Sequence, residues 1–182
     1  MHRPLRLALA CALAVLGGGV SALTASAQPK PAPSCSAPEC RQFDFWLGDW
    51  EVRKPDSSLA GGNLIERILD GCVLQENWTG VRGMRGKSYN MYSAADHQWH
   101  QIWVDSQGTW LALAGGLRDG KMVLAGDTPG ANGAVVRNRI TWQKLDDGRV
   151  RQHWETSADS GATWQDAFVG LYSRKSQPGG SR

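Results

Sequence analysis

Several common features are scarce or absent in this 182-residue chain, and each absence narrows the class of protein. Between residues 39 and 177 the only prolines are Pro55 and Pro129, and no low-complexity block or long linker occurs there. No apolar run after residue 20 approaches the roughly 20 residues that cross a bilayer, which predicts no transmembrane segment in the processed chain. Neither sign of charge dominates, with 20 Lys and Arg against 17 Asp and Glu, so nucleic acid is not an expected partner.

The sequence also lacks the signatures of the common catalytic classes. It contains no G-x-S-x-G, H-E-x-x-H, P-loop or C-x-x-C motif. His97 and His100 form H-x-x-H, but residues three apart on a strand face opposite sides, so we expect no shared metal site. The sequence therefore assigns no catalytic residue and favours a protein that is not an enzyme.

The N-terminal segment is typical of a cleavable signal peptide. Arg3 and Arg6 precede an apolar run over residues 7–20, and the A-S-A triplet ending at residue 27 offers a cleavage site. We therefore expect residues 1–27 to be removed on export and the protein to be periplasmic or secreted. A lipoprotein acylated at Cys11 is the alternative.

The remaining chain is long enough for one domain. Residues 28–40 are rich in Pro, Ala and Ser and predict an extended lead-in, while residues 176–182 predict a disordered tail. The domain itself is expected over residues 41–175. Nothing in the sequence predicts its oligomeric state.

Gly and Asp turn signals divide this domain into short segments rich in Val, Ile, Thr and Trp, which is typical of antiparallel β-structure. Alternate positions from 136 to 142 share one face, as expected of a strand with one buried side. The only helical turn expected lies near residues 42–47. About ten strands are predicted, at residues 49–54, 63–69, 72–79, 87–93, 97–105, 109–115, 121–126, 134–145, 149–157 and 164–174. Because closure removes exposed strand edges, we predict a single antiparallel barrel, with a sandwich as the alternative.

Three cysteines follow the expected cleavage site. Export implies an oxidising compartment, so Cys35, Cys40 and Cys72 predict one disulfide and one remaining thiol. Three pairings are possible, and the residues alone leave all of them open.

Several motifs along the domain carry a family resemblance. The segment F-D-F-W-L-G-D-W at residues 43–50 contains Gly48-x-Trp50, which resembles the G-x-W that opens the first strand of lipocalins. The segments G-C-V-L-Q-E-N-W at residues 71–78 and W-H-Q-I-W-V-D at residues 99–105 extend the match. Together they resemble a family of exported bacterial proteins whose lipocalin-like, calycin-type domain has no assigned function. The resemblance implies a barrel but no activity.

The resemblance also implies two contacts. It favours Cys35–Cys72 as the disulfide, with a local Cys35–Cys40 loop as the alternative. By analogy with lipocalins, Arg174 is expected to lie over the Trp50 ring in a cation–π contact, while Gly48 permits a close approach there.

One further motif has a structural interpretation. The segment S-A-D-S-G-A-T-W at residues 157–164 matches the Asp-box hairpin of sialidases and other β-proteins. In such a turn Asp159 caps backbone N–H groups, Gly161 takes a positive φ and Trp164 anchors the next strand. A propeller needs several copies of about 40 residues each, so this single copy does not indicate a sialidase.

Tryptophan is abundant, and it provides the functional hypothesis. Nine are present, and indoles on the same strand face as polar groups are typical of a small-ligand pocket. We therefore predict a barrel that binds a small apolar or aromatic molecule. The predicted ligand-binding residues are Glu76, Trp78, Asn90, Trp99, Gln101 and Trp103.

Three alternatives to this hypothesis remain. No cofactor is otherwise predicted, but His153 could be the axial ligand of a haem held in the barrel. Glu76 or Asp105 could act as a general acid or base if its pKa were perturbed in a cleft. The outside of the barrel could also serve a structural or interaction role.

Overall fold

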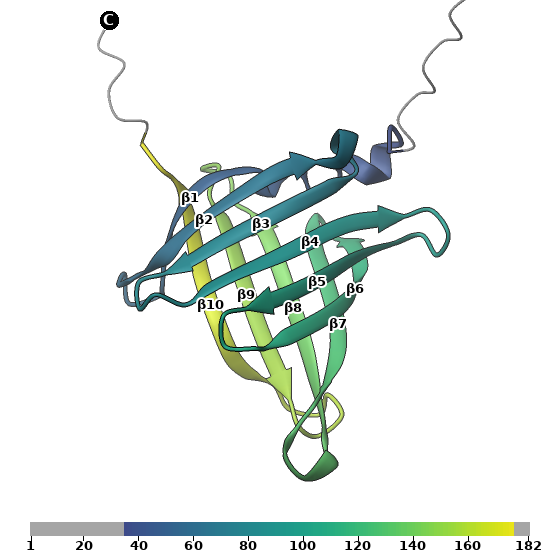
Figure 1. Cartoon of the computed structure of the whole chain (residues 1–182), viewed down its shortest axis with the longest axis vertical. Coiled ribbons are helices and arrows are strands. Elements are labelled where there is room, and N and C mark those ends of the chain that lie inside the picture. Colours follow the sequence, from purple (N-terminus) through teal and green to yellow (C-terminus); the bar gives the residue numbers. More distant parts are fainter. Residues whose placement is uncertain (1–34, 177–182) are drawn as a thin grey trace, which may run out of the picture. The chain divides into compact units, whose positions relative to one another are not determined.

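The computed structural model describes residues 35–176, which form a closed antiparallel barrel (Figure 1). The expected signal peptide of residues 1–27, Cys11, residues 28–34 of the lead-in and residues 177–182 of the tail lie outside the described residues. The strands are β1 (Gly48–Arg53), β2 (Leu59–Ile68), β3 (Val73–Gly80), β4 (Arg85–Ser93), β5 (Gln98–Asp105), β6 (Trp110–Arg118), β7 (Lys121–Pro129), β8 (Val135–Lys144), β9 (Val150–Ser157) and β10 (Gln165–Arg174). The predicted all-β barrel of about ten strands is confirmed, and the sandwich alternative is wrong.

Each strand pairs with the next strand along the chain, and the ring closes where β1 pairs with β10. At this closing pair Trp50 lies opposite Arg174 and Val52 lies opposite Tyr172. Closure leaves no strand of the sheet with an unpaired edge, which removes the usual site of edge-to-edge aggregation.

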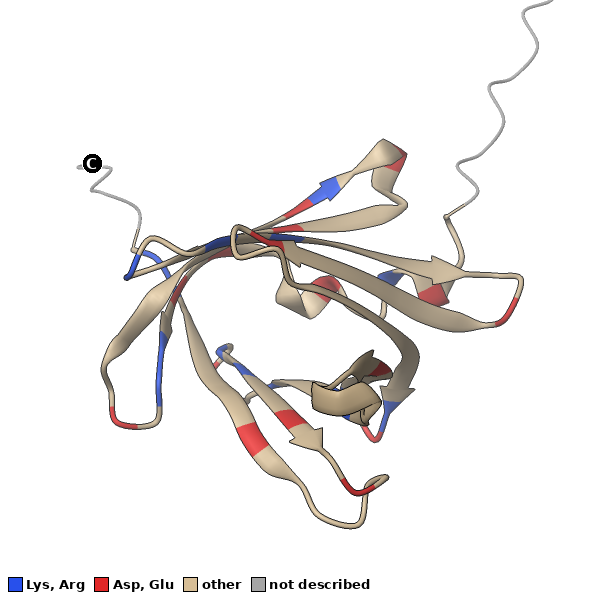
Figure 2. Cartoon of the chain, turned by 60° about the horizontal axis from the view of Figure 1, so that its bottom comes forward, with Lys and Arg blue, Asp and Glu red and all other residues tan. Residues whose placement is uncertain are grey.

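Alternation along the strands separates the interior of the barrel from its outer surface. In β8, Ile140 and Trp142 are buried inside, whereas Arg139 and Thr141 lie on the other face of the strand. Figure 2 shows acidic and basic residues interspersed over strands and loops, with neither sign gathered on one side. The outer surface therefore matches the balanced composition.

Short 3-10 turns interrupt this β-structure. The expected turn near residues 42–47 is present as η2 (Asp44–Trp46), and η1 (Pro38–Arg41) precedes it. The expectation of only one helical turn is wrong, because η3 (Leu69–Gly71) and η4 (Ala131–Gly133) occur between strands. Turns of three or four residues are too short to produce a helical repeat in the sequence, so pattern analysis misses them.

The segment before β1 folds into one end of the barrel, which we call the closed end. Phe43 and Trp46 are fully buried there and stack with their ring centroids 4.9 Å apart. Phe43 also meets Trp99 and Trp142 edge-on, at 5.6 and 5.2 Å. Trp50 donates a 2.8 Å hydrogen bond from its Nε1 to the carbonyl oxygen of Trp46. Burial of these rings therefore fixes the segment inside the barrel wall.

A disulfide ties the lead-in to the start of β3. Cys35 bonds to Cys72 across a sequence separation of 37, as the family resemblance implied, so the Cys35–Cys40 alternative is wrong. Cys40 is buried and is not in a disulfide. The Arg41 guanidinium reinforces the link by donating hydrogen bonds to the carbonyl oxygens of Cys35 and Gly71, at 3.1 and 3.3 Å.

The barrel seam carries a cation–π contact beside the closed end. The guanidinium carbon of Arg174 lies 4.1 Å from the centroid of the Trp50 ring. Gly48 makes room for it, because a Cβ at Gly48 would lie 1.7 Å from Arg174 Nη1. Glycine at this position is therefore required by the arginine as well as by its own φ of 139°.

The Asp-box turn between β9 and β10 is held together by its own side chains. The Asp159 carboxylate accepts hydrogen bonds from Ser157 Oγ, Thr163 N and Thr163 Oγ1, and these bonds lower the Asp159 pKa to about 2. Gly161 has a φ of 94°, and the Trp164 indole donates to its carbonyl oxygen at 3.1 Å. The side chains of Ser157, Asp159, Thr163 and Trp164 are therefore all engaged in hydrogen bonds of the turn.

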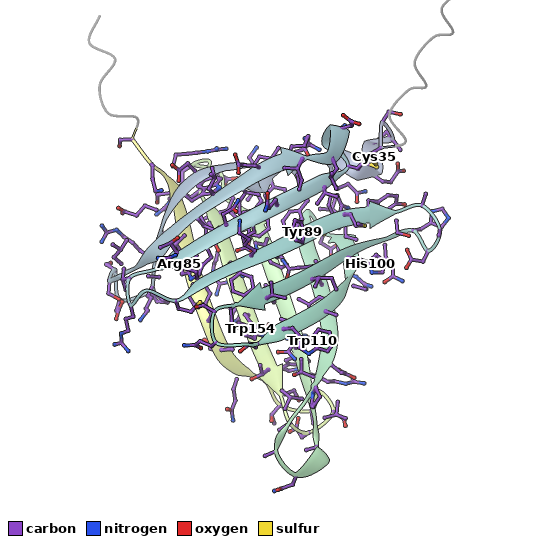
Figure 3. The ribbon with its side chains drawn as sticks, in the orientation of Figure 1. Cys35, Arg85, Tyr89, His100, Trp110 and Trp154 are labelled. Atoms are coloured by element: carbon purple, nitrogen blue, oxygen red, sulfur yellow. A yellow bond between two sulfur atoms is a disulfide. The ribbon has the colours of Figure 1, made fainter. Side chains whose placement is uncertain are left out.

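The outer face of β4, β5 and β6 is partly apolar. Tyr89, Ile102, Val104 and Trp110 are each between 44% and 59% exposed, and the register pairs Tyr89 with Ile102 and Val104 with Trp110. Figure 3 shows Tyr89 and Trp110 on this side of the barrel. Within residues 35–176, none of the helical segments has the length and hydrophobicity of a membrane span.

Candidate ligand-binding cavity

The inward-facing side chains change in character along the barrel axis. At the closed end they are apolar, in the middle they are polar, and toward the other end they are again aromatic. From the closed end outward they are Leu74, Glu76 and Trp78 in β3, Trp99, Gln101 and Trp103 in β5, and Val150, Gln152 and Trp154 in β9. A polar layer therefore separates the filled end of the barrel from the remainder of its interior.

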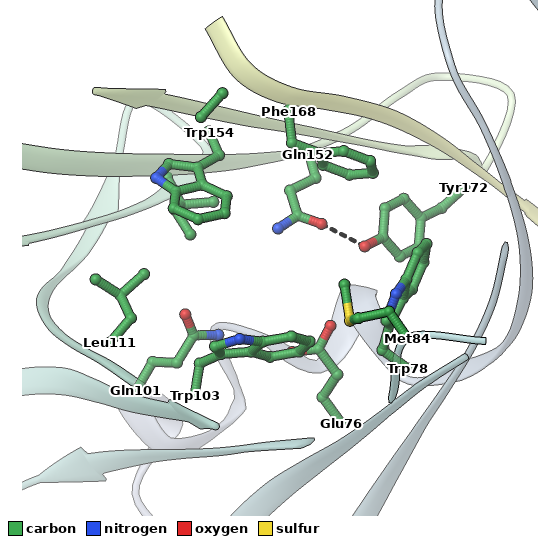
Figure 4. A pocket seen from close by; sticks show the side chains of 12 residues that line it. Glu76, Trp78, Met84, Gln101, Trp103, Leu111, Gln152, Trp154, Phe168 and Tyr172 are labelled. Carbon is green, nitrogen blue, oxygen red and sulfur yellow. Dashed lines mark hydrogen bonds between the residues drawn. The ribbon is translucent and has the colours of Figure 1, made fainter. Parts of the chain in front are cut away.

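A cavity of about 280 Å³ occupies the interior beyond this polar layer (Figure 4). Cavities of roughly 150 Å³ hold benzene, so this volume suits a molecule of about two fused rings. No Lys or Arg is among its lining residues. The lining consists of Glu76, Trp78, Met84, Gln101, Trp103, Leu111, Ile140, Gln152, Trp154, Ala167, Phe168 and Tyr172.

Four of the six predicted ligand-binding residues line the cavity, namely Glu76, Trp78, Gln101 and Trp103. Trp99 does not, because it lies one level deeper, where it packs on Phe43 at the closed end. Asn90 also lies behind the lining, where its amide nitrogen donates to Leu74 O and its oxygen accepts from Gln101. Both residues therefore support the cavity from behind.

The opposite wall of the cavity was not predicted. Gln152 and Trp154 come from β9, and Phe168 and Tyr172 come from β10. Leu111, which was not predicted either, lies in β6 beside Trp103 of β5. The alternation of Val150, Gln152 and Trp154 with polar residues does predict that these three side chains face inward. It does not predict which side chains of other strands they face across the barrel. The register of ten strands is needed to place these residues opposite β3 and β5.

Glu76 is the only ionisable carboxyl group in the lining. Its Oε1 accepts a hydrogen bond from Asn63 Nδ2 at 2.7 Å, and its Oε2 accepts one from Ser88 Oγ at 2.6 Å. Burial raises the pKa of Glu76 to about 7, and the two hydrogen bonds offset that rise only in part. The group therefore changes charge near neutral pH.

A second chain of hydrogen bonds crosses the polar layer to β9 and β10. The Tyr172 hydroxyl donates to Gln152 Oε1 and accepts from Asn63 Nδ2 at 3.3 Å. Burial and the neighbouring Glu76 carboxylate raise the pKa of Tyr172 well above its ordinary value. Tyr172 is therefore a neutral hydrogen-bonding group at physiological pH, and it holds Gln152 in place.

The free ends of two glutamine side chains in the lining have no hydrogen-bond partner among residues 35–176. Gln152 uses its oxygen for Tyr172, which leaves its Nε2 donor free. Gln101 uses its nitrogen for Asn90 and Ser88, at 2.8 and 3.4 Å, which leaves its Oε1 acceptor free. Figure 4 shows both free atoms directed toward the open interior.

The aromatic walls are fixed by contacts with one another and with residues around the cavity. Trp103 lies against Gly86, where a Cβ would be 2.1 Å from two atoms of the indole ring. The Trp154 indole donates to Asn138 Oδ1 at 3.0 Å, and Trp78 meets Phe168 edge-on at 6.1 Å. The walls therefore have a set arrangement before any ligand arrives.

His153 lies on the face of β9 opposite Gln152 and Trp154, which line the cavity. Its Nε2 is 2.6 Å from Asp166 Oδ1, and with Glu155 these residues place three possible metal-ligand atoms within 4.8 Å. Both oxygens of Glu155 already accept hydrogen bonds from Arg139, so the positive charge of the guanidinium balances the negative charge of the carboxylate. A haem bound to His153 would therefore lie outside the cavity. The haem alternative stays a prediction, and the position of the cavity does not support it.

The other singled-out polar residues have local partners. His100 Nε2 lies 2.8 Å from Asp96 Oδ2, and His97 lies in the turn before β5, where its Nδ1 is 3.4 Å from the Tyr92 hydroxyl. Asp105 accepts hydrogen bonds from the backbone N–H groups of Gln107 and Thr109, so it stabilises a turn.

Comparison with known proteins adds no assignment, because no protein-family model and no curated protein sequence matches this chain. The functional argument therefore depends on the cavity itself.

Proposed function

We propose that this protein binds a small apolar or aromatic molecule in the barrel cavity. The observation that carries the proposal is the aromatic cavity of about 280 Å³, because the other half of the same barrel is filled with side chains. An apolar lining with a few polar groups is the usual form of a small-ligand site. The fixed walls favour binding, since few side chains lose freedom when a ligand enters.

The proposal extends to where the protein works. The Cys35–Cys72 disulfide supports an extracytoplasmic location, which agrees with the signal peptide expected at residues 1–27. We therefore propose a periplasmic or secreted carrier related to the exported lipocalin-like family that the sequence motifs resemble.

A neutral aromatic probe tests the cavity directly. Prodan, a neutral dye built on the two fused rings of naphthalene whose emission rises and shifts to the blue in apolar surroundings, should bind the purified protein. Gly86→Ala should weaken this binding by about tenfold or more, because the new Cβ would displace the Trp103 indole into the cavity. Fluorescence titration measures the affinity, and circular dichroism checks that the variant retains its β-structure.

Gly116→Ala is the matched control, because a Cβ there meets nothing within 4 Å. It should bind the probe as the unmodified protein does. Equal affinity of a folded Gly86→Ala variant, or no binding by the unmodified protein, would contradict the proposal.

A second candidate function is an enzyme that uses Glu76 as a general acid or base. The specific observation in its favour is a cavity-lining carboxyl group whose pKa is raised to about 7 by burial. A general base works best when its pKa lies near the operating pH. Asp105, the other candidate from the sequence, is occupied in its turn.

Base catalysis can be tested with 5-nitrobenzisoxazole, a neutral planar molecule. A carboxylate removes the C3 proton while the ring N–O bond breaks, which gives a coloured cyanophenolate. The rate should rise as the pH passes about 7 and should fall to background in Glu76→Gln. Glu66→Gln, on the exposed outer side of β2, is the control. Equal rates in the two variants would remove this candidate.

A further inference from the structure

We infer that the ligand is a neutral, planar aromatic molecule with one hydrogen-bond acceptor and one hydrogen-bond donor. Its acceptor would bind Gln152 and its donor would bind Gln101. This inference rests on the proposed function and names the chemical class that the same cavity accepts. It depends on three features, which are the free polar atoms, the shape of the walls and the charge of the lining.

The free polar atoms define what the ligand must offer. Gln152 Nε2 is a donor and requires an acceptor, whereas Gln101 Oε1 is an acceptor and requires a donor. Neither amide is free to exchange its two ends. Reversing Gln152 would leave the Tyr172 hydroxyl proton without its acceptor, at an oxygen that already accepts from Asn63. Reversing Gln101 would set two carbonyl oxygens of amides against each other at Asn90.

Both residues are largely buried, with Gln101 2% and Gln152 9% exposed, but their free atoms are open to the cavity and are not enclosed by protein. A ligand that fills the cavity covers these atoms, and a polar atom that is covered without a partner is costly. A ligand that supplies the complementary groups gains these two hydrogen bonds. A purely apolar ligand would instead leave the donor and the acceptor unpaired.

The walls favour a flat molecule. Trp103 lies on one side of the cavity, and Phe168 and Trp154 lie on the other (Figure 4). Aromatic side chains gain most from a partner with a planar face that stacks or meets them edge-on. Trp103 is fixed against Gly86 and Trp154 is fixed by Asn138, so the slot keeps its shape.

The charge of the lining favours a neutral molecule. An anionic ligand such as a fatty acid would meet no Lys or Arg in the lining, and it would lie beside Glu76. A cation would find Glu76 as the single acidic group in the lining, it would share the Glu76 oxygens with Asn63 and Ser88, and it would lose its own water shell on entering an apolar cavity. Neutral polar groups therefore match the cavity better than a full charge of either sign.

The test compares bicyclic molecules of similar size in competition with prodan. Quinolin-2-one and quinolin-4-one each carry an N–H donor and a carbonyl acceptor, at different spacings. Naphthalene carries neither group, and 2-naphthoate adds a negative charge. The better quinolinone should bind at least tenfold tighter than naphthalene, because two hydrogen bonds are gained, and 2-naphthoate should bind weakest.

Two variants assign this preference to the named side chains. Gln152→Met and Gln101→Met should each reduce quinolinone affinity by about threefold to tenfold while naphthalene binds as well as before or better. Gln98→Met is the matched control, because Gln98 is exposed at the start of β5, and it should change no affinity. Thermal melting of each variant separates a loss of binding from a loss of fold.

The outcomes separate the inference from the proposed function. If all four molecules bind alike, or if 2-naphthoate binds tightest, the inference is overturned and the barrel remains an aromatic-binding protein. If neither the probe nor any of the four molecules binds, both proposals fail. A quinolinone preference that persists in both Met variants would assign the recognition to other residues and overturn the inference.

Discussion

Replacing Trp46 with alanine should lower the free energy of unfolding by about 3–5 kcal/mol, the range typical of Trp→Ala in a core. Trp46 is fully buried at the closed end and packs between Phe43, Trp142 and Tyr172, with ring centroids 4.9, 5.3 and 6.4 Å away. No strand holds it there, because it belongs to η2, a single 3-10 turn. Its removal leaves a cavity that the rigid barrel wall cannot close.

Urea denaturation followed by circular dichroism measures this loss. The control is Trp110→Ala, which removes the same side chain from the outer surface, where Trp110 is 59% exposed. That change should cost about 2 kcal/mol or less, because more than half of Trp110 is already in water in the folded protein. Similar losses for the two variants would mean that the segment before β1 does not contribute to the core as described.

The second large effect concerns pH. The Glu76 carboxyl group is expected to lose its proton near pH 4.5 in the unfolded chain but only near pH 7 in the folded barrel, because burial raises its pKa. Between these values the folded state binds more protons than the unfolded state, so the free energy of unfolding falls as the pH rises. The fall should amount to about 3 kcal/mol across the window and should level off above about pH 7.

Glu76→Gln should remove this pH dependence, since glutamine does not titrate, while Glu66→Gln on the outer side of β2 should retain it. The measurement is the difference in free energy of unfolding between each variant and the unmodified protein, at pH 4.5, 6 and 8. A difference for Glu76→Gln that stays constant over this range would show that Glu76 is not buried as an ionisable group. The comparison is needed because other groups also titrate in this range.

Much of the barrel could be predicted from the sequence, and particular residues explain why. Period-two alternation identifies Ile140 and Trp142 as inward-facing, and Gly and Asp signals mark the turns, so strand number and topology follow. The Cys35–Cys72 disulfide could not be predicted from the sequence pattern alone, because three cysteines allow three pairings. Only the family resemblance favoured this pairing. Short sequence patterns identify the strands and turns of this fold well, but they do not indicate which residues distant in sequence pair with each other.

The cavity was only half predictable for a related reason. Trp99 and Trp103 share one face of one strand, yet Trp99 lies at the closed end and Trp103 lines the cavity. A strand face indicates whether a side chain is inside, whereas depth along the barrel depends on the stagger between strands. In the register Trp99 stands opposite Gly115 and Trp103 stands opposite Leu111, and neither pairing could be predicted from the sequence alone.

The pairing of β1 with β10 also determines the order in which the protein can fold. All other neighbouring strands are joined by a turn, so each of those hairpins can form from residues close together in sequence. The seam joins Trp50 to Arg174, which lie almost a full domain apart along the chain. Such non-local pairs form late and slow the folding of β-proteins, because the intervening chain must be ordered first. Until β10 is in place, β1 and β9 are open edges that a second chain can pair with, so the last strand protects the whole barrel from aggregation.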